Sequence, residues 1–143
     1  MSPSREALER ENDAFYEALN NHDVKEIMSR IADDVIDHQL PPEMPSGKEG
    51  VAALFTMMFD STPDLRFEIL DTIISGDKVA IRSRMTGTQT GPLLQMPVTG
   101  KPFDVEGIDI VKVNDDLKVV EHWGILDVAK MMQQTGLVPP PPM

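Results

Sequence analysis

Apolar and polar residues alternate along residues 105–127, in two arms that are joined by the polar turn 114–117. The alternation predicts a β-hairpin, because side chains on a strand point in turn to its two faces and Asn and Asp favour tight turns. The apolar face is interrupted by Asp109 on the first arm and by Glu121 and His122 on the second. Burying such groups costs free energy unless they are paired or used. The hairpin is therefore the first indication of a functional site.

The rest of the chain predicts helices followed by strands. Asp23 and Asp127 stand at N-cap positions, each just before a helix. The order of elements fits an α+β fold, in which N-terminal helices wrap a strongly curved antiparallel sheet into a cone with an internal pocket. The predicted helices are 6–19, 24–31, 48–59 and 128–134, and the predicted strands are 65–74, 78–89, 103–113 and 118–126, after a short strand or extended segment at 35–38.

Length and composition favour one small globular domain. The chain has 143 residues, which suits a single domain at 1–138 followed by a proline-rich, mobile tail at 139–143. It contains no cysteine, which excludes disulfides and thiolate chemistry. No apolar run approaches the ~20 residues needed to cross a bilayer, and the charged N-terminal segment does not have the pattern of a signal peptide. We therefore expect a cytoplasmic protein.

The charge pattern argues against nucleic acid as a partner. The formal net charge is −11 and no basic cluster is present. Proteins that bind nucleic acid neutralise phosphates with clustered Lys and Arg side chains. The acidity is interpreted as a contribution to solubility.

The pairing of the hairpin decides which groups meet on its apolar face. A four-residue turn places Asp109 opposite His122, whereas a three-residue turn places it opposite Glu121 and brings Trp123 to the same side. An apolar pocket raises the pKa of a carboxylic acid and a neighbouring imidazolium lowers it, so such a pair can transfer a proton near neutral pH. The alternative is a purely structural Asp–His hydrogen bond.

Other polar residues are weaker candidates. His38 follows the extended segment and precedes a proline-rich loop, where it is either a third pocket group or structural. Arg82 can bind an acidic ligand or simply occupy an exposed strand face. Trp123 fits a pocket wall or the core. Gly107 and Gly124, which lack side chains, would leave room for a ligand between the strands.

The sequence offers no motif for a metal or a cofactor. The three histidines do not have the spacing of HxH or HExxH sites. No phosphate-binding loop, dinucleotide-binding glycine pattern or nucleophile elbow is found. We expect neither a metal nor a cofactor.

Several segments, in order along the chain, carry a resemblance to a known family. They are Asp37-His38, GTQTG at 87–91, PVTGK at 97–101, VEGIDIVKV at 105–113 and EHW at 121–123. The chain resembles the SnoaL-like polyketide cyclases and predicted ester cyclases from about residue 10 to Leu137. The resemblance implies the cone-shaped α+β fold of the nuclear transport factor 2-like superfamily, usually as a homodimer packed through the outer sheet face.

The resemblance also implies a reaction. Cyclases of this type close a ring by an intramolecular aldol reaction without metal or cofactor, using an Asp as acid/base and a neighbouring His. Matched strand by strand, the position of that His is Asp109 here and the catalytic Asp falls on Gly124. Asp109 also matches the hydrogen-bonding Asp of the related ketosteroid isomerases. These matches favour the four-residue turn, while Gln89 and Gln95 differ from the family in a loop expected at the pocket rim.

We therefore hypothesise a cofactor-independent cyclase or isomerase that moves a proton next to a carbonyl of a small apolar oxygenated metabolite, such as a polyketide. The alternatives are a non-catalytic binding protein of the same fold and an epoxide-type hydrolase that uses Arg82. We expect neither nucleic acid nor membrane as a partner, and a homodimer. The predicted catalytic residues are Asp109 and His122, and the predicted substrate-binding residues are His38, Arg82, Gln89, Glu121, Trp123 and Gly124.

Overall fold

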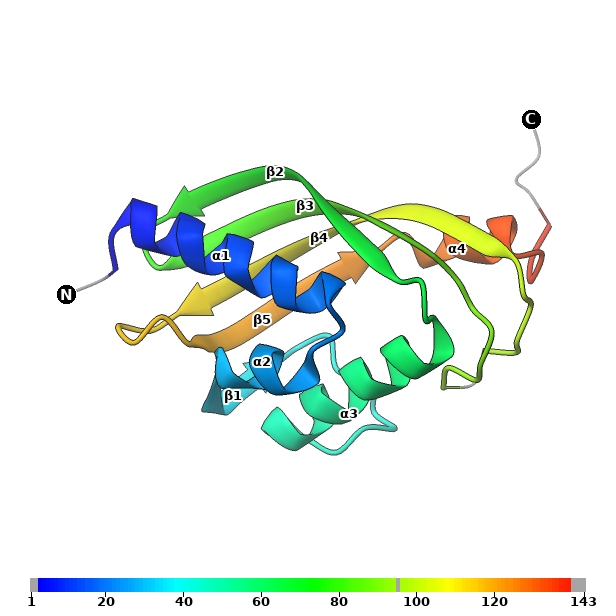
Figure 1. The fold of residues 1–143 in the computed structure, drawn as a ribbon, viewed down its shortest axis with the longest axis horizontal. Helices are drawn as coiled ribbons and strands as arrows, with labels where there is room; N and C mark the ends of the chain where they lie inside the picture. Colours follow the sequence, from blue (N-terminus) through cyan, green and yellow to red (C-terminus); the bar gives the residue numbers. More distant parts are fainter. Residues whose placement is uncertain (1–2, 95, 140–143) are drawn as a thin grey trace.

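The computed structural model of the chain describes residues 3–94 and 96–139 (Figure 1). Across these residues the chain forms an α+β fold with four helices and five strands. The helices are α1 (Arg5–Asn20), α2 (Val24–Ser29), α3 (Gly47–Ser61) and α4 (Val128–Gln134). The strands are β1 (Ile31–Asp37), β2 (Arg66–Ser75), β3 (Lys78–Thr88), β4 (Pro102–Val113) and β5 (Val119–Leu126). The predicted tail at 139–143 lies, except for residue 139, outside the described residues.

The five strands form one sheet in the order β1-β5-β4-β3-β2. Strands β2 to β5 are antiparallel, as predicted, but β1 runs parallel to β5, so the sheet is mixed. The segment 35–38, predicted as a short strand or an extended segment, belongs to a strand that begins earlier, at Ile31. Helix α2 ends at Ser29 instead of residue 31, because Ile31 already pairs with Val119 and the Arg30 carbonyl accepts a hydrogen bond from Val119.

Aspartates begin two of the helices, as predicted. The side chain of Asp23 accepts a hydrogen bond from the Glu26 amide at the start of α2. The side chain of Asp127 does the same for the Lys130 amide at the start of α4. Each cap satisfies an amide that has no partner within its own helix.

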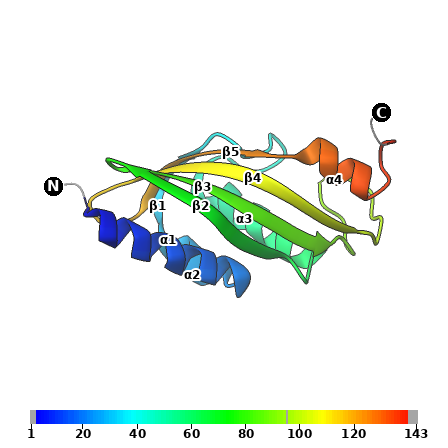
Figure 2. The same cartoon turned by 90° about the horizontal axis from the view of Figure 1, so that it is seen from above.

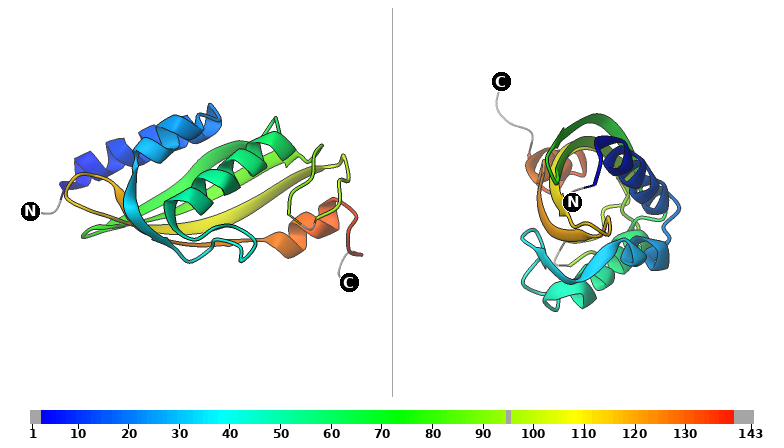
Figure 3. Two further views of the ribbon diagram at one scale, coloured as in Figure 1. Left: turned by 90° about the horizontal axis from the view of Figure 1, so that it is seen from below. Right: turned by 90° about the vertical axis from the view of Figure 1, so that its left-hand side faces the viewer.

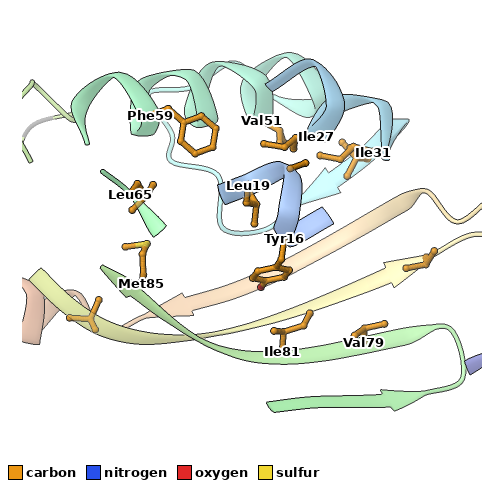
Figure 4. Packing of buried hydrophobic residues seen from close by; sticks show 14 of the residues in the cluster. Tyr16, Leu19, Ile27, Ile31, Val51, Phe59, Leu65, Val79, Ile81 and Met85 are labelled. Carbon is orange, nitrogen blue, oxygen red and sulfur yellow. The ribbon is translucent and has the colours of Figure 1, made fainter. Parts of the chain in front are cut away.

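Helices α1 and α3 lie along one face of the sheet, and α4 follows β5 at the far end of the molecule (Figures 1 and 2). In the end-on view α1 and α3 lie around one side of the strands, and α4 lies apart from them (Figure 3). Apolar side chains from the helices and the sheet fill the space between them, among them Leu19, Ile27, Val79 and Ile81 (Figure 4). The alternation predicted for β3 is confirmed, since Val79, Ile81 and Met85 are buried, while Arg82 and Arg84 are exposed.

The β4–β5 hairpin has neither of the two predicted registers. Asp109 is paired with Gly124, and Val111 is paired with His122. Two features cause this pairing. Val113 pairs with Val119, so the turn has five residues (114–118) instead of four, and Val120 is an extra residue on β5, because Lys112 pairs with Glu121. The observed pairing differs by two residues from the four-residue-turn prediction. A shift of two keeps every side chain on its face, so Asp109 and His122 still share the inner face.

Candidate active site

A cavity of about 410 Å³ lies between the helices and the inner face of the sheet. Its walls are mainly apolar and come from α1, α3, α4 and all five strands. A few polar groups converge on one part of it, which is the usual composition of a small-molecule site. These groups are Tyr16, Asp37, Gln39, Ser83, Asp109 and His122.

His122 is held between two carboxylates. Its Nδ1 atom lies 2.9 Å from Oδ1 of Asp37. Its Nε2 atom lies 2.8 Å from Oδ1 of Asp109. Asp37 reaches this position because β1 runs beside β5, where Asp37 and His122 are direct partners. Three strands therefore each supply one member of an Asp37–His122–Asp109 triad.

The two carboxylates determine the charge of the imidazole. Burial alone lowers the pKa of His122, but the hydrogen bonds and negative charges of Asp109 and Asp37 exceed this effect and raise the pKa to about 9. Burial raises the pKa of Asp37, yet the contacts with His122 lower it overall. At neutral pH His122 is therefore an imidazolium, and both of its N–H groups donate to a carboxylate.

Asp109 faces the cavity with one oxygen committed to His122. Oδ1 accepts the hydrogen bond from Nε2, and no hydrogen bond to Oδ2 is present among the described residues. The side chain of Asp109 is 30% exposed, more than the 11% of Asp37. Asp109 is thus the carboxylate of the triad that is accessible to a ligand.

Tyr16 brings a phenol to the same part of the cavity. Its ring extends from α1 toward the strands, above Ile81 (Figure 4). Burial is the main cause that raises the pKa of Tyr16, and the negative charge of Asp109 adds to it. A hydrogen bond with Ser83 acts in the opposite direction, as expected where the serine donates to the phenol oxygen. Tyr16 therefore stays a neutral hydrogen-bond donor beside Asp109.

Gln89, a predicted substrate-binding residue, lines the cavity away from the triad. It is 4% exposed, and its Nε2 atom donates to the carbonyls of Gly91 at 3.1 Å and Met96 at 3.4 Å. The side chain thus fixes the backbone of the loop that follows β3. Gln95, which differs from the family in the same loop, lies outside the described residues.

Four other predicted substrate-binding residues do not line the cavity, so their assignment to the pocket is corrected. Glu121 and Trp123 flank His122 on β5, and Arg82 flanks Ser83 on β3; strand neighbours point to opposite faces. On the outer face, Arg82 pairs with Glu106 at 2.7 Å. His38 contacts Glu121 at 2.6 Å and stacks on Trp123.

The open space predicted at Gly124 is not present. A Cβ atom added to Gly124 would lie 2.2 Å from Oε1 of Gln39 and 2.6 Å from Oδ1 of Asp109. The carboxamide of Gln39 and the carboxylate of Asp109 thus fill this position. Gly107 lines the cavity, but an added Cβ would already be tight against the Ile125 carbonyl at 3.2 Å.

Four site residues were missed by the sequence analysis. Ser83 interrupts the buried side of β3 in the way that Asp109 interrupts β4, so the signal that identified Asp109 was also available for Ser83. Tyr16 lies on the buried side of α1, where its hydroxyl requires a partner. Asp37 ends a strand whose parallel pairing was not predicted. Gln39 stands in a loop, and no sequence pattern marks it.

The triad is poorly suited to binding a metal. Both ring nitrogens of His122 face carboxylates and carry protons, so neither offers a lone pair. Within the described ranges, no group of His, Asp and Glu side chains has the arrangement of a metal site.

None of the helices in the described residues is long and apolar enough to span a bilayer.

A family model and several solved structures are similar to this chain. The family model of SnoaL-like polyketide cyclases matches residues 10–135. TsrD from Streptomyces laurentii has a similar structure, with a TM-score of 0.85 and 26% identity over 95% of this chain and 99% of TsrD. IdmH from Streptomyces antibioticus, a candidate polyketide cyclase, gives a TM-score of 0.76 and 29% identity over 90% of this chain and 98% of IdmH.

The fold is shared more widely. A protein from Catenulispora acidiphila with a ketosteroid isomerase-like fold, solved with trimethylamine, gives a TM-score of 0.72 at 16% identity, over 88% of this chain and 92% of that protein. At this identity the likeness concerns the fold alone. No curated protein sequence matches the chain.

Proposed function

Since the chain belongs to the SnoaL-like polyketide cyclase family, we propose that it is an enzyme that moves a proton at the carbon next to a carbonyl group. The proposed substrate is a small, apolar, oxygenated metabolite of the polyketide type, and the outcome is cyclisation or isomerisation without a cofactor. The observation that carries the proposal is the carboxylate of Asp109, which faces an apolar cavity beside an imidazolium.

Asp109 is the proposed base. Its Oδ2 atom would take the proton, the C–H bond would break, and the electron pair of that bond would form an enolate. The neutral hydroxyl of Tyr16 would donate a hydrogen bond to the enolate oxygen. Proton return from Asp109 to another carbon gives isomerisation. In cyclisation the carbanion attacks a carbonyl carbon, and the oxygen of that carbonyl takes up the proton.

His122 has a different proposed role from Asp109. An imidazole that is protonated at neutral pH cannot accept a proton from the substrate, so His122 would act as a charged donor to Asp109. Asp37 would orient His122 through the hydrogen bond to Nδ1, without touching the substrate.

Exchange of carbon-bound hydrogen in heavy water tests this function. Benzylacetone, an apolar monoketone small enough for the cavity, is incubated with the protein, and deuterium beside its carbonyl is measured by mass spectrometry. Asp109→Asn should lower the catalysed exchange by a factor of about 10² to 10⁴, the usual contribution of a general base. Asp34→Asn, at an exposed residue of β1, is the control. Equal exchange in wild type and Asp109→Asn would contradict the proposal.

A non-catalytic binding protein is the second candidate. It is favoured by one observation, the absence of an acid at position 124, where the resembled cyclases carry theirs and where Gln39 packs here. Native mass spectrometry after incubation with benzylacetone separates the two functions, because a binding protein would retain the ketone with no deuterium gained. The structure gives no support to the hydrolytic alternative, because Arg82 pairs with Glu106 on the outer face.

A homodimer is proposed on the outer sheet face. Apolar side chains are exposed there on adjacent strands, among them Ile108 and Ile110 on β4, Ile125 on β5 and Ile36 on β1. Burial of such side chains stabilises association. Ile108→Glu should convert a dimer to a monomer in analytical ultracentrifugation, and a wild-type monomer would refute this proposal.

A further inference from the structure

The carboxamide of Gln39 is an unusual feature of the site. Gln39 follows β1, outside any helix or strand, and its side chain nevertheless lines the cavity. Its backbone amide donates to Oδ1 of Asp37 at 2.9 Å, the same oxygen that contacts His122. The backbone of Gln39 is thus hydrogen-bonded to the triad, and its side chain lies beside a member of the same triad.

The missing side chain at position 124 makes room for this carboxamide. The Cβ position of Gly124 lies 2.2 Å from Oε1 and 2.7 Å from Cδ of Gln39. The same point lies 2.6 Å from Oδ1 of Asp109. The amide group and the carboxylate are therefore neighbours above Gly124, at the point where β5 pairs with β4.

Within the described part of the chain, the carboxamide of Gln39 makes no hydrogen bond. Such a group carries two donor hydrogens and one acceptor oxygen. A half-turn about its terminal bond exchanges the nitrogen and the oxygen, and so presents a donor beside Asp109. Gln39 is an exposed residue at the edge of the cavity, so a ligand oxygen can take the place of water at this donor.

Gln39 and Tyr16 approach Asp109 from different sides. Strand β4 lies between β5 and β3 in the sheet. Gln39 sits over Gly124 of β5, while Tyr16 interacts with Ser83 of β3, and both line the cavity. A ligand carbon above Asp109 would therefore have one hydrogen-bonding group on each side.

We propose that this site binds β-dicarbonyl compounds, with one oxygen at Tyr16, the other at Gln39, and the carbon between them over Asp109. The inference rests on the proposed function and adds to it a class of substrate and a specificity-determining residue. The chemistry is consistent, because removal of a proton from the central carbon gives an enolate whose charge is shared by both oxygens. Each of the two donors would then stabilise part of that charge.

A matched pair of ligands tests the inference. Benzoylacetone has two carbonyls separated by one carbon, and benzylacetone has a methylene in place of the second carbonyl. Titration calorimetry should show that the wild-type protein binds benzoylacetone at least about tenfold more tightly, the ratio expected for one good hydrogen bond. Gln39→Leu should reduce the ratio of the two affinities to below about threefold. The affinity of this variant for benzylacetone should stay within about twofold of the wild-type value.

Two further variants keep the test decisive. Gln133→Leu makes the same substitution on α4, away from the cavity lining, and should retain the wild-type ratio. Gln39→Glu places a second carboxylate beside Asp109 and should weaken benzoylacetone binding more than Gln39→Leu does. Circular dichroism verifies that each variant is folded. A ratio that is near one in the wild type, or unchanged in Gln39→Leu, would overturn the inference.

The outcome is separable from that of the proposed function. Selective, Gln39-dependent binding without deuterium exchange would support the ligand class and refute the catalytic role of Asp109. Deuterium exchange that depends on Asp109, without preferential binding of benzoylacetone, would support the catalytic role and refute the ligand class.

Discussion

The Nε2 atom of His122 lies 2.8 Å from Oδ1 of Asp109, although the residue directly across from Asp109 is Gly124. The contact is diagonal, and diagonal neighbours on one sheet face are within reach of a long or aromatic side chain. The five-residue turn between Val113 and Val119 and the extra residue Val120 together set this register. The position opposite Asp109 is consequently occupied by a side chain from a loop, that of Gln39.

Asp37→Asn should lower the pKa of His122. The substitution removes one of the two negative charges that raise this pKa to about 9, while the hydrogen bond to Asp109 is kept. We expect a fall of at least about one unit, typical for the loss of one adjacent charge. An NMR titration of the His122 ring measures it, with Asp34→Asn as the control. An unchanged titration would show that Asp37 does not act on the imidazole.

The free energy of unfolding should fall as the pH rises above 6.5. The pKa of His122 is raised from 6.5 to about 9 on folding. The stabilisation is therefore fully present below pH 6.5 and is lost as the pH rises to about 9, a change of about 3 kcal/mol. Asp37, whose pKa is lowered from 3.8, stays ionised throughout this range.

Urea denaturation at a series of pH values measures this dependence. His122→Asn should lower the overall stability and remove most of the decline between pH 6.5 and 9. His38→Asn, on the outer face, removes a histidine without touching the triad and should retain the decline. The same slope in wild type and His122→Asn would assign the dependence to other groups.

Gly124→Ala should destabilise the fold through Gln39. The new Cβ would overlap with the Gln39 carboxamide and with Asp109, which is held by His122. We expect a loss of about 1–3 kcal/mol, the usual cost of overpacking. Removing the carboxamide with Gln39→Ala should recover part of that loss in the double variant. Additive losses in thermal unfolding would show that the two positions are not coupled.

Asn20→Ala should loosen the attachment of α1 to the edge strand β2. The side chain of Asn20 donates to the Phe67 carbonyl at 3.0 Å and accepts from the Phe67 amide at 2.7 Å. Loss of both hydrogen bonds should cost about 1–3 kcal/mol, because two partly buried backbone groups lose their partner. Asn21→Ala, at the exposed neighbour, should cost much less in the same denaturation experiment.

The order of elements and most of their bounds were predictable, because helical and strand periodicities are local properties of the chain. Helix α4 at Val128–Gln134 was predicted with its observed bounds. The α+β class followed from that order. The hairpin register was not predictable, because the five-residue turn and the extra residue Val120 together shift the pairing by two, which leaves the same residues on each face.

The site was predicted only in part. Asp109 and His122 were found because each interrupts an apolar face, and the structure places them together. Asp37 and Gln39 were missed because their approach depends on the parallel pairing of β1 with β5, which no local pattern encodes. Glu121 and Trp123 were assigned to the pocket although they are strand neighbours of His122 and therefore face outward.

The parallel pairing of β1 with β5 has a consequence for folding. Asp37 and His122 are 85 residues apart in sequence, so the segment between them must close as a large loop before they meet. Contacts of such separation form late when local elements assemble first. A chain that has been synthesised only as far as β4 contains Asp37 and Asp109 but not His122. The two carboxylates then lack the imidazolium that both contact in the folded protein. The triad is completed only when β5 is added to the sheet.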